Sequence, residues 1–93
     1  MRKAKARHIL VEEQKECQDL KEQINNGRNF ADIAKQYSTC PSGKSGGSLG
    51  EFSQGQMVHE FDDVVFNQSL NEVHGPVQTQ FGYHLIEVLS RDE

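Results

Sequence analysis

The sequence of 93 residues contains no tryptophan, only two prolines and two cysteines, and no long apolar run. A membrane-spanning helix needs about 20 consecutive apolar residues, so we expect no membrane span and no membrane partner. Cys17 and Cys40 allow one disulfide at most, and a chain of this composition does not need it, so we expect reduced thiols. The basic start is followed by the short apolar segment 9–11, which is too short for a secretion signal and favours a cytoplasmic protein.

Basic charge is also scarce. Ten lysine and arginine residues stand against fourteen aspartate and glutamate residues, which gives a formal net charge of −4. Nucleic-acid binding relies on clustered cations that displace the counterions of phosphate, so we expect no nucleic-acid partner. The length suits one modest hydrophobic core, and we therefore expect a single domain over residues 1–93, acting as a monomer.

Metal-binding and nucleotide-binding spacings are missing as well. The four histidines and two cysteines form neither C-x-x-C nor H-x-x-x-H, so we expect no metal and no cofactor. Gly43-Lys44-Ser45 matches the end of a phosphate-binding loop, but Ser38 stands where that motif has its first glycine. The motif also needs a strand before it and a helix after it, which is the reverse of the order expected here.

The first half of the sequence predicts one strand and two helices. Residues 6–11 are rich in apolar and β-branched types, which is typical of a strand. Apolar residues at helical spacing over residues 17–24 predict a helix that ends at Asn26-Gly27 in a left-handed cap. A second helix should begin after Asn29, whose side chain can cap it. Its expected buried face consists of Phe30, Ile33, Ala34 and Tyr37.

The second half begins with the glycine-rich and serine-rich segment 42–50. It predicts a flexible loop that enters a strand at about residues 48–52. Met57, Phe61, Val64 and Val65 have helical spacing and predict a third helix.

The C-terminal part predicts a β-hairpin. Gly75-Pro76 should open a strand that runs to Thr79, and residues 80–82 should form a tight turn. Residues 83–89 form the expected final strand, antiparallel to the one before it. Together, these elements predict a small α+β domain with helices packed on a sheet.

A cysteine hydrolase is one interpretation of the reactive residues. Cys40 with His8 or His84 would supply a nucleophile and a base, because such partners meet in space rather than in sequence. Backbone N–H groups of the glycine-rich segment would then stabilise an oxyanion. The residue types alone leave this alternative open.

Seven short motifs, the first at residue 7 and the last ending at residue 84, follow one another along nearly the whole chain. They are RHILV (7–11), YSTC (37–40), GGSLG (46–50), GQMV (55–58), FDDVVF (61–66), GPV (75–77) and FGYH (81–84). In this order and spacing they resemble the parvulin family of peptidyl-prolyl cis/trans isomerases, especially its minimal stand-alone bacterial members.

The resemblance implies an α+β fold: a four-stranded antiparallel sheet surrounded by four helices, in the order β-α3-β-α-β2. It adds a short helical turn near residues 41–44. It also implies four catalytic residues. His8 and His84 are expected as a pair on neighbouring central strands, with Thr79 bonded to both, and Cys40 is expected to face the isomerising bond.

The resemblance further implies a proline-binding pocket. Leu49, Met57 and Phe61 correspond to its walls, and Phe81 to a further substrate contact. The implied substrates are proline-containing polypeptides, such as unfolded or nascent chains, and neither a metal nor a cofactor is needed. Rotation about an X-Pro bond meets a barrier of about 18–20 kcal/mol, which an apolar pocket lowers when it strips water from the amide and binds the twisted state more tightly.

The same resemblance bears on mechanism. Two histidines in one hydrogen-bond chain would stabilise the central strands and shape the site without transferring a proton. Relatives can carry aspartate at the position of Cys40, so the reaction does not require a covalent nucleophile. We therefore expect Cys40 to tune the polarity around the substrate carbonyl.

Substrate choice follows from a missing segment. Phosphate-specific relatives carry a long basic loop after the first strand, whereas acidic residues 12, 13 and 16 follow it here. This predicts an apolar residue before the proline, with Arg7 and Lys44 as cations that would soften the discrimination. A binding module for proline-containing segments, with incidental catalysis, is the competing function.

Overall fold

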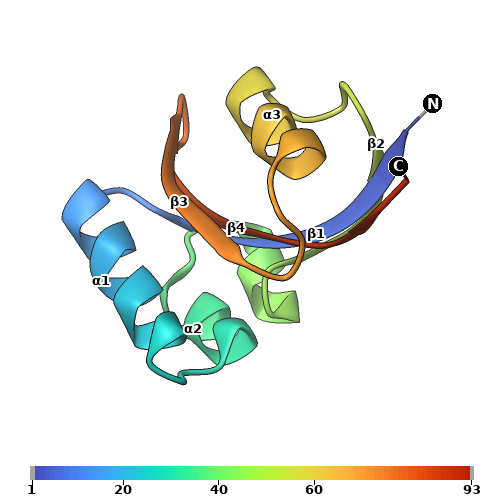
Figure 1. The fold of residues 1–93 in the computed structure, drawn as a ribbon. Coiled ribbons are helices and arrows are strands. Elements are labelled where there is room, and N and C mark those ends of the chain that lie inside the picture. The colour runs from blue at the N-terminus through green and yellow to red at the C-terminus, as the bar shows by residue number, and fades with distance from the viewer. Residues whose placement is uncertain (1, 93) are drawn as a thin grey trace.

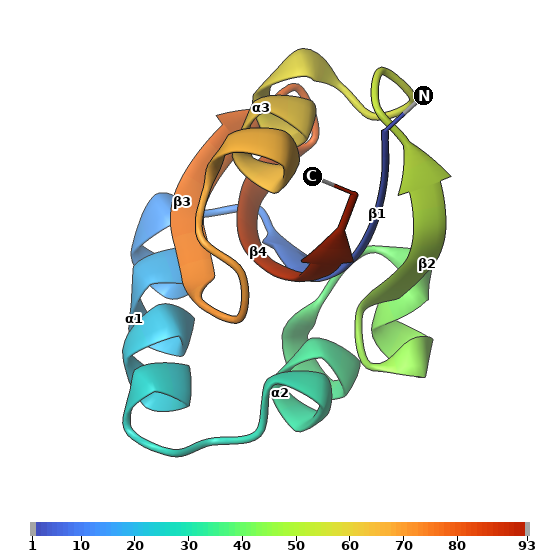
Figure 2. The ribbon, with the colours of Figure 1, turned by 45° about the vertical axis from the view of Figure 1, so that its right-hand side comes forward.

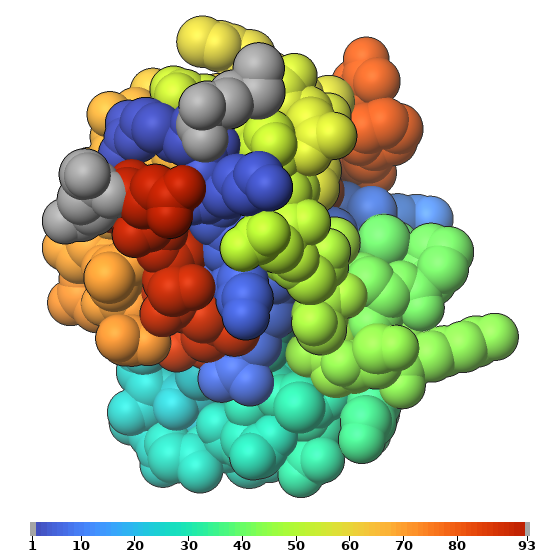
Figure 3. Space-filling model, turned by 90° about the vertical axis from the view of Figure 1, so that its right-hand side faces the viewer, coloured from blue at the N-terminus to red at the C-terminus, as the bar shows by residue number. Residues whose placement is uncertain are grey.

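Four strands form one antiparallel sheet in the computed structural model, which describes residues 2–92. They are β1 (Lys3–Val11), β2 (Ser48–Ser53), β3 (Val73–Thr79) and β4 (Gly82–Arg91). Their order across the sheet is β2-β1-β4-β3, so the first and last strands of the chain are the central ones. Figure 3 shows this order at the surface, with β1 in blue between β4 in red and β2 in yellow-green.

Helices cover both faces of the sheet. α1 (Gln14–Asn25) and α2 (Phe30–Tyr37) lie on one face, and α3 (His59–Asn67) lies on the other (Figure 1). The 3-10 helix η1 (Pro41–Ser45) leads from α2 into β2. The predicted α+β fold and the predicted order of elements are confirmed, with η1 as the third helix of the first group. Figure 2 shows the curved sheet with β2 and β3 at its opposite edges.

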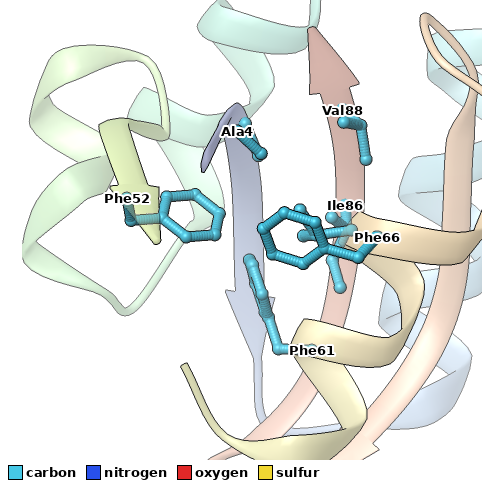
Figure 4. Close-up of a cluster of buried hydrophobic side chains, with 8 residues drawn as sticks. Ala4, Phe52, Phe61, Phe66, Ile86 and Val88 are labelled. Carbon is cyan, nitrogen blue, oxygen red and sulfur yellow. The ribbon is translucent and has the colours of Figure 1, made fainter. Parts of the chain in front are cut away.

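Each face of the sheet has its own hydrophobic core, because successive side chains of a strand point to opposite faces. Toward α3 lie Ala4, Ala6, Phe52, Phe61, Val65, Phe66, Ile86 and Val88 (Figure 4). Toward α1 and α2 lie Ile9, Val11, Cys17, Leu20, Phe30, Ile33, Ala34 and Leu85. Even-numbered residues in the middle of β1 and β4 therefore face α3, and His8 and His84 are among them.

The predicted helix ends are confirmed. The chain leaves α1 through Gly27, whose φ of +108° is a conformation that glycine adopts without strain. Asn29 caps α2, because its Oδ1 accepts the backbone N–H of Asp32 at 3.0 Å.

The glycine-rich segment is not the predicted flexible loop. It forms η1 and the start of β2, as the family resemblance implied for residues 41–44. Gly47 has a φ of +86°, and a Cβ on it would lie 2.3 Å from the carbonyl oxygen of His8. A Cβ on Gly43 would lie 2.9 Å from the carbonyl oxygen of Ala34. These glycines therefore let the segment pack closely on β1 and α2, rather than make it mobile.

Three further details differ from the sequence prediction. Tyr37 was predicted to be buried but is 36% exposed, because α2 ends there and the chain turns back to β1, where the N–H of Thr39 donates to the carbonyl of Leu10 at 2.8 Å. Met57 precedes α3 instead of lying within it. The strand expected to open at Gly75 begins at Val73, since His74 already pairs with Ile86 of β4.

β3 is an edge strand with an interrupted ladder. Gly75-Pro76 has a cis peptide bond and lies where the pairing register with β4 shifts, between His74 and Val77. Lys21 of α1 reaches this point, where its Nζ donates to the carbonyl of Gly75 at 2.8 Å.

Candidate active site

Two buried histidines form the floor of the site. Leu10 of β1 pairs with His84 of β4, and His8 pairs with Ile86, so the two histidines are diagonal neighbours on one sheet face. Their Nδ1 atoms are 3.0 Å apart, and the rings stack at 18° with centroids 5.2 Å apart. His8 is 5% exposed and His84 is 4% exposed. The predicted histidine pair on neighbouring central strands is confirmed.

The outer nitrogen of each ring has a different partner. His84 Nε2 lies 2.7 Å from Thr79 Oγ1, and His8 Nε2 lies 3.1 Å from Ser42 Oγ. The prediction that Thr79 bonds to both histidines is therefore wrong. The ring of His8 lies between His84 and η1, so its Nε2 points toward η1 and away from β3.

Two more hydrogen bonds extend this chain at its ends. The backbone N–H of Phe81 donates to Thr79 Oγ1 at 3.1 Å. At the other end, Ser42 Oγ lies 3.3 Å from Cys40 Sγ. The hydrogen bonds thus connect the β3–β4 turn, both central strands and η1.

Burial keeps both histidines neutral. Loss of hydration, and secondarily the neighbouring charge of His84, lower the pKa of His8 to about 4. Burial also lowers the pKa of His84, against a smaller opposing effect of the Glu60 carboxylate. At neutral pH each ring therefore carries one proton, and the contact between the two Nδ1 atoms holds a single proton.

An apolar cavity of about 520 Å³ opens above the histidines. It lies between η1 and β2 on one side and α3 on the other, with the β3–β4 turn at its rim. Its walls are His8, Leu10, Thr39, Cys40, Pro41, Leu49, Gln56, Met57, Val58, Phe61, Phe81 and His84. All the predicted substrate-binding residues line this cavity.

Phe61 and Phe81 contribute to the cavity in different ways. Phe61 is 3% exposed, and its ring meets the rings of His8 and His84 edge to face, with centroids 5.4 and 5.6 Å away. It is thus part of the α3-side core, where Figure 4 shows it, as well as of the cavity wall. Phe81 lies on the turn and is 59% exposed, so its ring is available to a ligand.

Sequence reasoning missed several wall residues and Ser42. Leu10 follows His8 by two residues on one strand, so the period of a strand already places it on the same face. Ser42 lies in the segment interpreted as a loop and Pro41 directly before it, and only the folding of these residues into η1 brings Ser42 between Cys40 and His8.

The geometry does not support the cysteine-hydrolase interpretation. All four ring nitrogens of the two histidines have a partner other than Cys40: each other, Thr79 and Ser42. Neither histidine therefore contacts the thiol directly. Among residues 2–92, no group of three or more potential ligands lies close enough together to hold a metal ion, and no helix is long and apolar enough to cross a membrane.

Comparison with known proteins agrees with this arrangement. The family model described as the PPIC-type PPIase domain matches residues 1–92. The chain belongs to this family of peptidyl-prolyl cis/trans isomerase domains. Among solved structures, this isomerase domain is similar to the parvulin NmPin of Nitrosopumilus maritimus, with 37% identity over 97% of this chain and 98% of that one, and a TM-score of 0.86.

Longer proteins also contain a similar isomerase domain. Foldase protein PrsA of Geobacillus sp. is 42% identical over 98% of this chain and 33% of its own length. PrsA of Bacillus anthracis superimposes with a TM-score of 0.95, at 33% identity, over 99% of this chain and 43% of that one. The chain thus spans about a third of the length of the curated relatives that it matches. Its cytoplasmic location and monomeric state stay predictions.

The buried neutral histidines predict a loss of stability in acid. Unfolded histidine binds a proton below about pH 6.5, whereas folded His8 binds one only near pH 4. The free energy of unfolding should therefore be level above about pH 6.5 and fall as the pH drops from there to about 4. The contribution of His8 is on the order of 3 kcal/mol at 1.36 kcal/mol per pKa unit, and His84 acts in the same direction.

Urea unfolding at a series of pH values measures this loss. His8→Asn should flatten the acid decline, whereas His59→Gln, at an exposed position, should keep it. An equally steep decline in His8→Asn would contradict the assignment.

Proposed function

We propose that the cavity accelerates rotation about X-Pro bonds by removing water from the substrate amide. The observation that supports this most is the nature of the walls: apolar side chains above two neutral, hydrogen-bonded histidines. A planar amide is charge-separated by resonance, and twisting it removes that charge separation. Water stabilises the planar form more than the twisted one, so a dry cavity favours the twisted form and lowers the barrier.

The proline ring would bind between Leu49, Met57 and Phe61. Met57 precedes α3 and is only partly buried, so its flexible thioether can follow the ring as the peptide turns. Phe61 is held by the core below it and by both histidines, and gives the cavity a fixed wall. Phe81, exposed at the rim, would contact the residue next to the proline.

His8, His84 and Thr79 would act through position rather than through proton transfer. Their ring nitrogens and hydroxyl are engaged with one another and, at His8 Nε2, with Ser42, and burial lowers the pKa of both rings so that they stay uncharged. Neutral rings at the floor of the cavity do not bring in the water that a charged group would hold. Cys40, at the wall, would then set the polarity around the substrate carbonyl.

We also propose that the residue before the proline is preferably apolar. Arg7 is no candidate for a phosphate anchor, since it faces α2: its Nε lies 2.7 Å from Glu87 Oε1 and its guanidinium stacks over Phe30 at 4.6 Å. Glu60, near His84, adds negative charge beside the cavity. Lys44, exposed on η1, is a cation that can still reach a bound peptide.

A binding role without catalysis is the second candidate. It is favoured by the name foldase that the PrsA relatives carry. An NMR exchange or protease-coupled assay on an Ala-Leu-Pro-Phe peptide separates the two functions, because a pure binding module would take up the peptide without accelerating its isomerisation.

Met57→Ala should lower kcat/KM by about tenfold or more, because it removes apolar wall that keeps water from the proline. The free energy of unfolding should change little, since Met57 is only partly buried. Leu89→Ala is the matched control: it removes an exposed apolar side chain of β4 outside the cavity and should leave kcat/KM unchanged. Full activity in Met57→Ala would mean that the proline binds elsewhere.

For Phe61, a substitution by leucine is a better test of the proline pocket than a substitution by alanine. Phe61→Ala would remove a core side chain, at a cost of about 3–5 kcal/mol in stability, so lost activity would not report on the pocket alone.

Cys40→Asp should keep measurable isomerase activity, and chelators should not reduce it. A carboxylate accepts the hydrogen bond from Ser42 as the sulfur does, and the proposed mechanism contains neither a covalent step nor a metal. The measurement is kcat/KM on the same peptide, with unfolding followed in parallel. A folded variant without activity, or a thioester trapped on the unmodified protein, would favour a cysteine nucleophile instead.

In a series of X-Pro peptides, leucine, methionine or phenylalanine at X should be turned over faster than glutamate, with phosphoserine slowest. Phosphate brings up to about two negative charges, which need guanidinium or ammonium partners when they are partly dehydrated. Lys44→Ala should reduce turnover of the phosphoserine peptide further and leave the leucine peptide unaffected. Faster turnover of phosphoserine-proline than of leucine-proline at physiological salt would overturn the preference.

A further inference from the structure

The connection between β2 and α3 supplies part of the cavity wall without belonging to either element. Residues 54–58 lie between the end of β2 and the start of α3, and Gln56, Met57 and Val58 line the cavity. A segment outside helices and strands has no ladder or helix bonds along its length to fix it. The position of this part of the wall therefore depends on individual hydrogen bonds.

The start of the connection is tied to the sheet. The N–H of Gln54 donates to the carbonyl of Arg2 at 2.8 Å. The N–H of Gln56 donates to the carbonyl of Ser53 at 3.2 Å, and Gln56 Oε1 accepts the N–H of Ser53 at 2.6 Å. These bonds hold the turn against β1 and β2, but they do not reach α3, where Phe61 forms the fixed wall.

Asp62 of α3 ties the rest of the connection to the helix. Its carboxylate Oδ1 accepts the N–H of Gly55 at 2.8 Å, and its own N–H donates to the carbonyl of Val58 at 2.9 Å. Asp62 thus holds residues on both sides of Met57. Because Asp62 follows Phe61 directly in the helix, it joins the flexible part of the wall to the fixed part.

Two features make the bond between Asp62 and Gly55 important for this junction. Its acceptor is a carboxylate, and hydrogen bonds to a charged acceptor are shorter and stronger than neutral ones. In addition, α3 begins without a side-chain cap, because the apolar Val58 stands at the N-cap position. The usual polar contact between a helix and the segment that enters it is therefore missing, and Asp62 supplies a contact from within the helix.

We propose that Asp62 is a positioning residue for the isomerase site, which holds the connection in the place where Met57 can contact the proline. The backbone of residues 55–58 is then fixed before a substrate binds, while the thioether of Met57 stays free to move. Without the carboxylate, binding must first order this segment, and the free energy of ordering is lost from the affinity. The proposal rests on the proposed function for its effect on turnover, but not for the role of the bond in holding the wall.

Amide hydrogen exchange, followed by NMR and corrected for intrinsic rates, tests the bond itself. In the unmodified protein, the amide proton of Gly55 should exchange more slowly than that of Met57, which donates to no group among residues 2–92. Asp62→Ala should remove this difference. Equal exchange of the two protons in the unmodified protein would overturn the proposal. The measurement needs no substrate, so its failure is distinct from failure of the proposed function, which would appear as absent isomerase activity in the unmodified protein.

Asp62→Ala should raise KM for the Ala-Leu-Pro-Phe peptide by about three- to tenfold, the range that corresponds to one hydrogen bond, and change kcat by less than about twofold. This split is expected because the segment is ordered again once the peptide is bound. A variant that only lost folded protein would instead show a lower apparent kcat at an unchanged KM. The ratio of the two effects therefore separates positioning from stability.

Two further variants separate the hydrogen bond from the charge. Asp62→Asn removes the charge but keeps an acceptor oxygen, so it should recover most of the affinity and the slow exchange of Gly55. Asp63→Ala removes the same charge from the next residue of α3, whose carboxylate accepts from Asn67 Nδ2 at 2.9 Å, and should change neither signal. An unchanged KM in Asp62→Ala, or an equal rise of KM in Asp63→Ala, would overturn the proposal.

Discussion

The structure depends on the hydrogen bond between the Nδ1 atoms of His8 and His84. Two imidazoles on one face of the central strands are buried at a place where each unpaired nitrogen would be costly. Their mutual bond satisfies one nitrogen of each, but it requires β1 and β4 to keep the register that makes them diagonal neighbours. The remaining nitrogens then require a partner from β3 and one from η1, so a single pair constrains four separate segments of the chain.

The two faces of the sheet have different roles. The side of α1 and α2 carries a closed core, together with the pair of Arg7 and Glu87. The side of α3 carries a core that stays open at one end, where Phe61 is shared between packing and the cavity wall. Stability and ligand access are thus served by opposite faces of the same strands.

The sequence predicts most of the architecture, because local signals and motif order agree. The cap at Asn29, the turn at Gly27 and the hairpin around residues 80–82 depend on neighbours within a few residues. The order of the motifs, through the family resemblance, also predicted the four-stranded sheet and the residues around the pocket. Where only local patterns were used, as for the segment 42–50, the same residue types were compatible both with a flexible loop and with the ordered structure that they form.

The sequence predictions that were wrong or incomplete have one physical cause in common. Glycines 43, 46 and 47 have the composition of a loop, and only the closeness of α2 and β1 shows that they are needed for packing. Ser42 belongs to that segment, so its place between His8 and Cys40 depends on how the segment folds back. Tyr37 continues the apolar spacing of α2, but the helix ends at that residue. Each case depends on contacts between segments distant in sequence.

The irregular edge at β3 bears on whether another extended chain can pair with the sheet. An exposed strand edge is a template on which another extended chain can pair. At the middle of β3, Pro76 offers no N–H, the register shifts, and Lys21 occupies the carbonyl of Gly75. An extended polypeptide therefore finds no continuous ladder there to extend, and β-sheet growth is disfavoured along the strand that supplies Thr79 to the site.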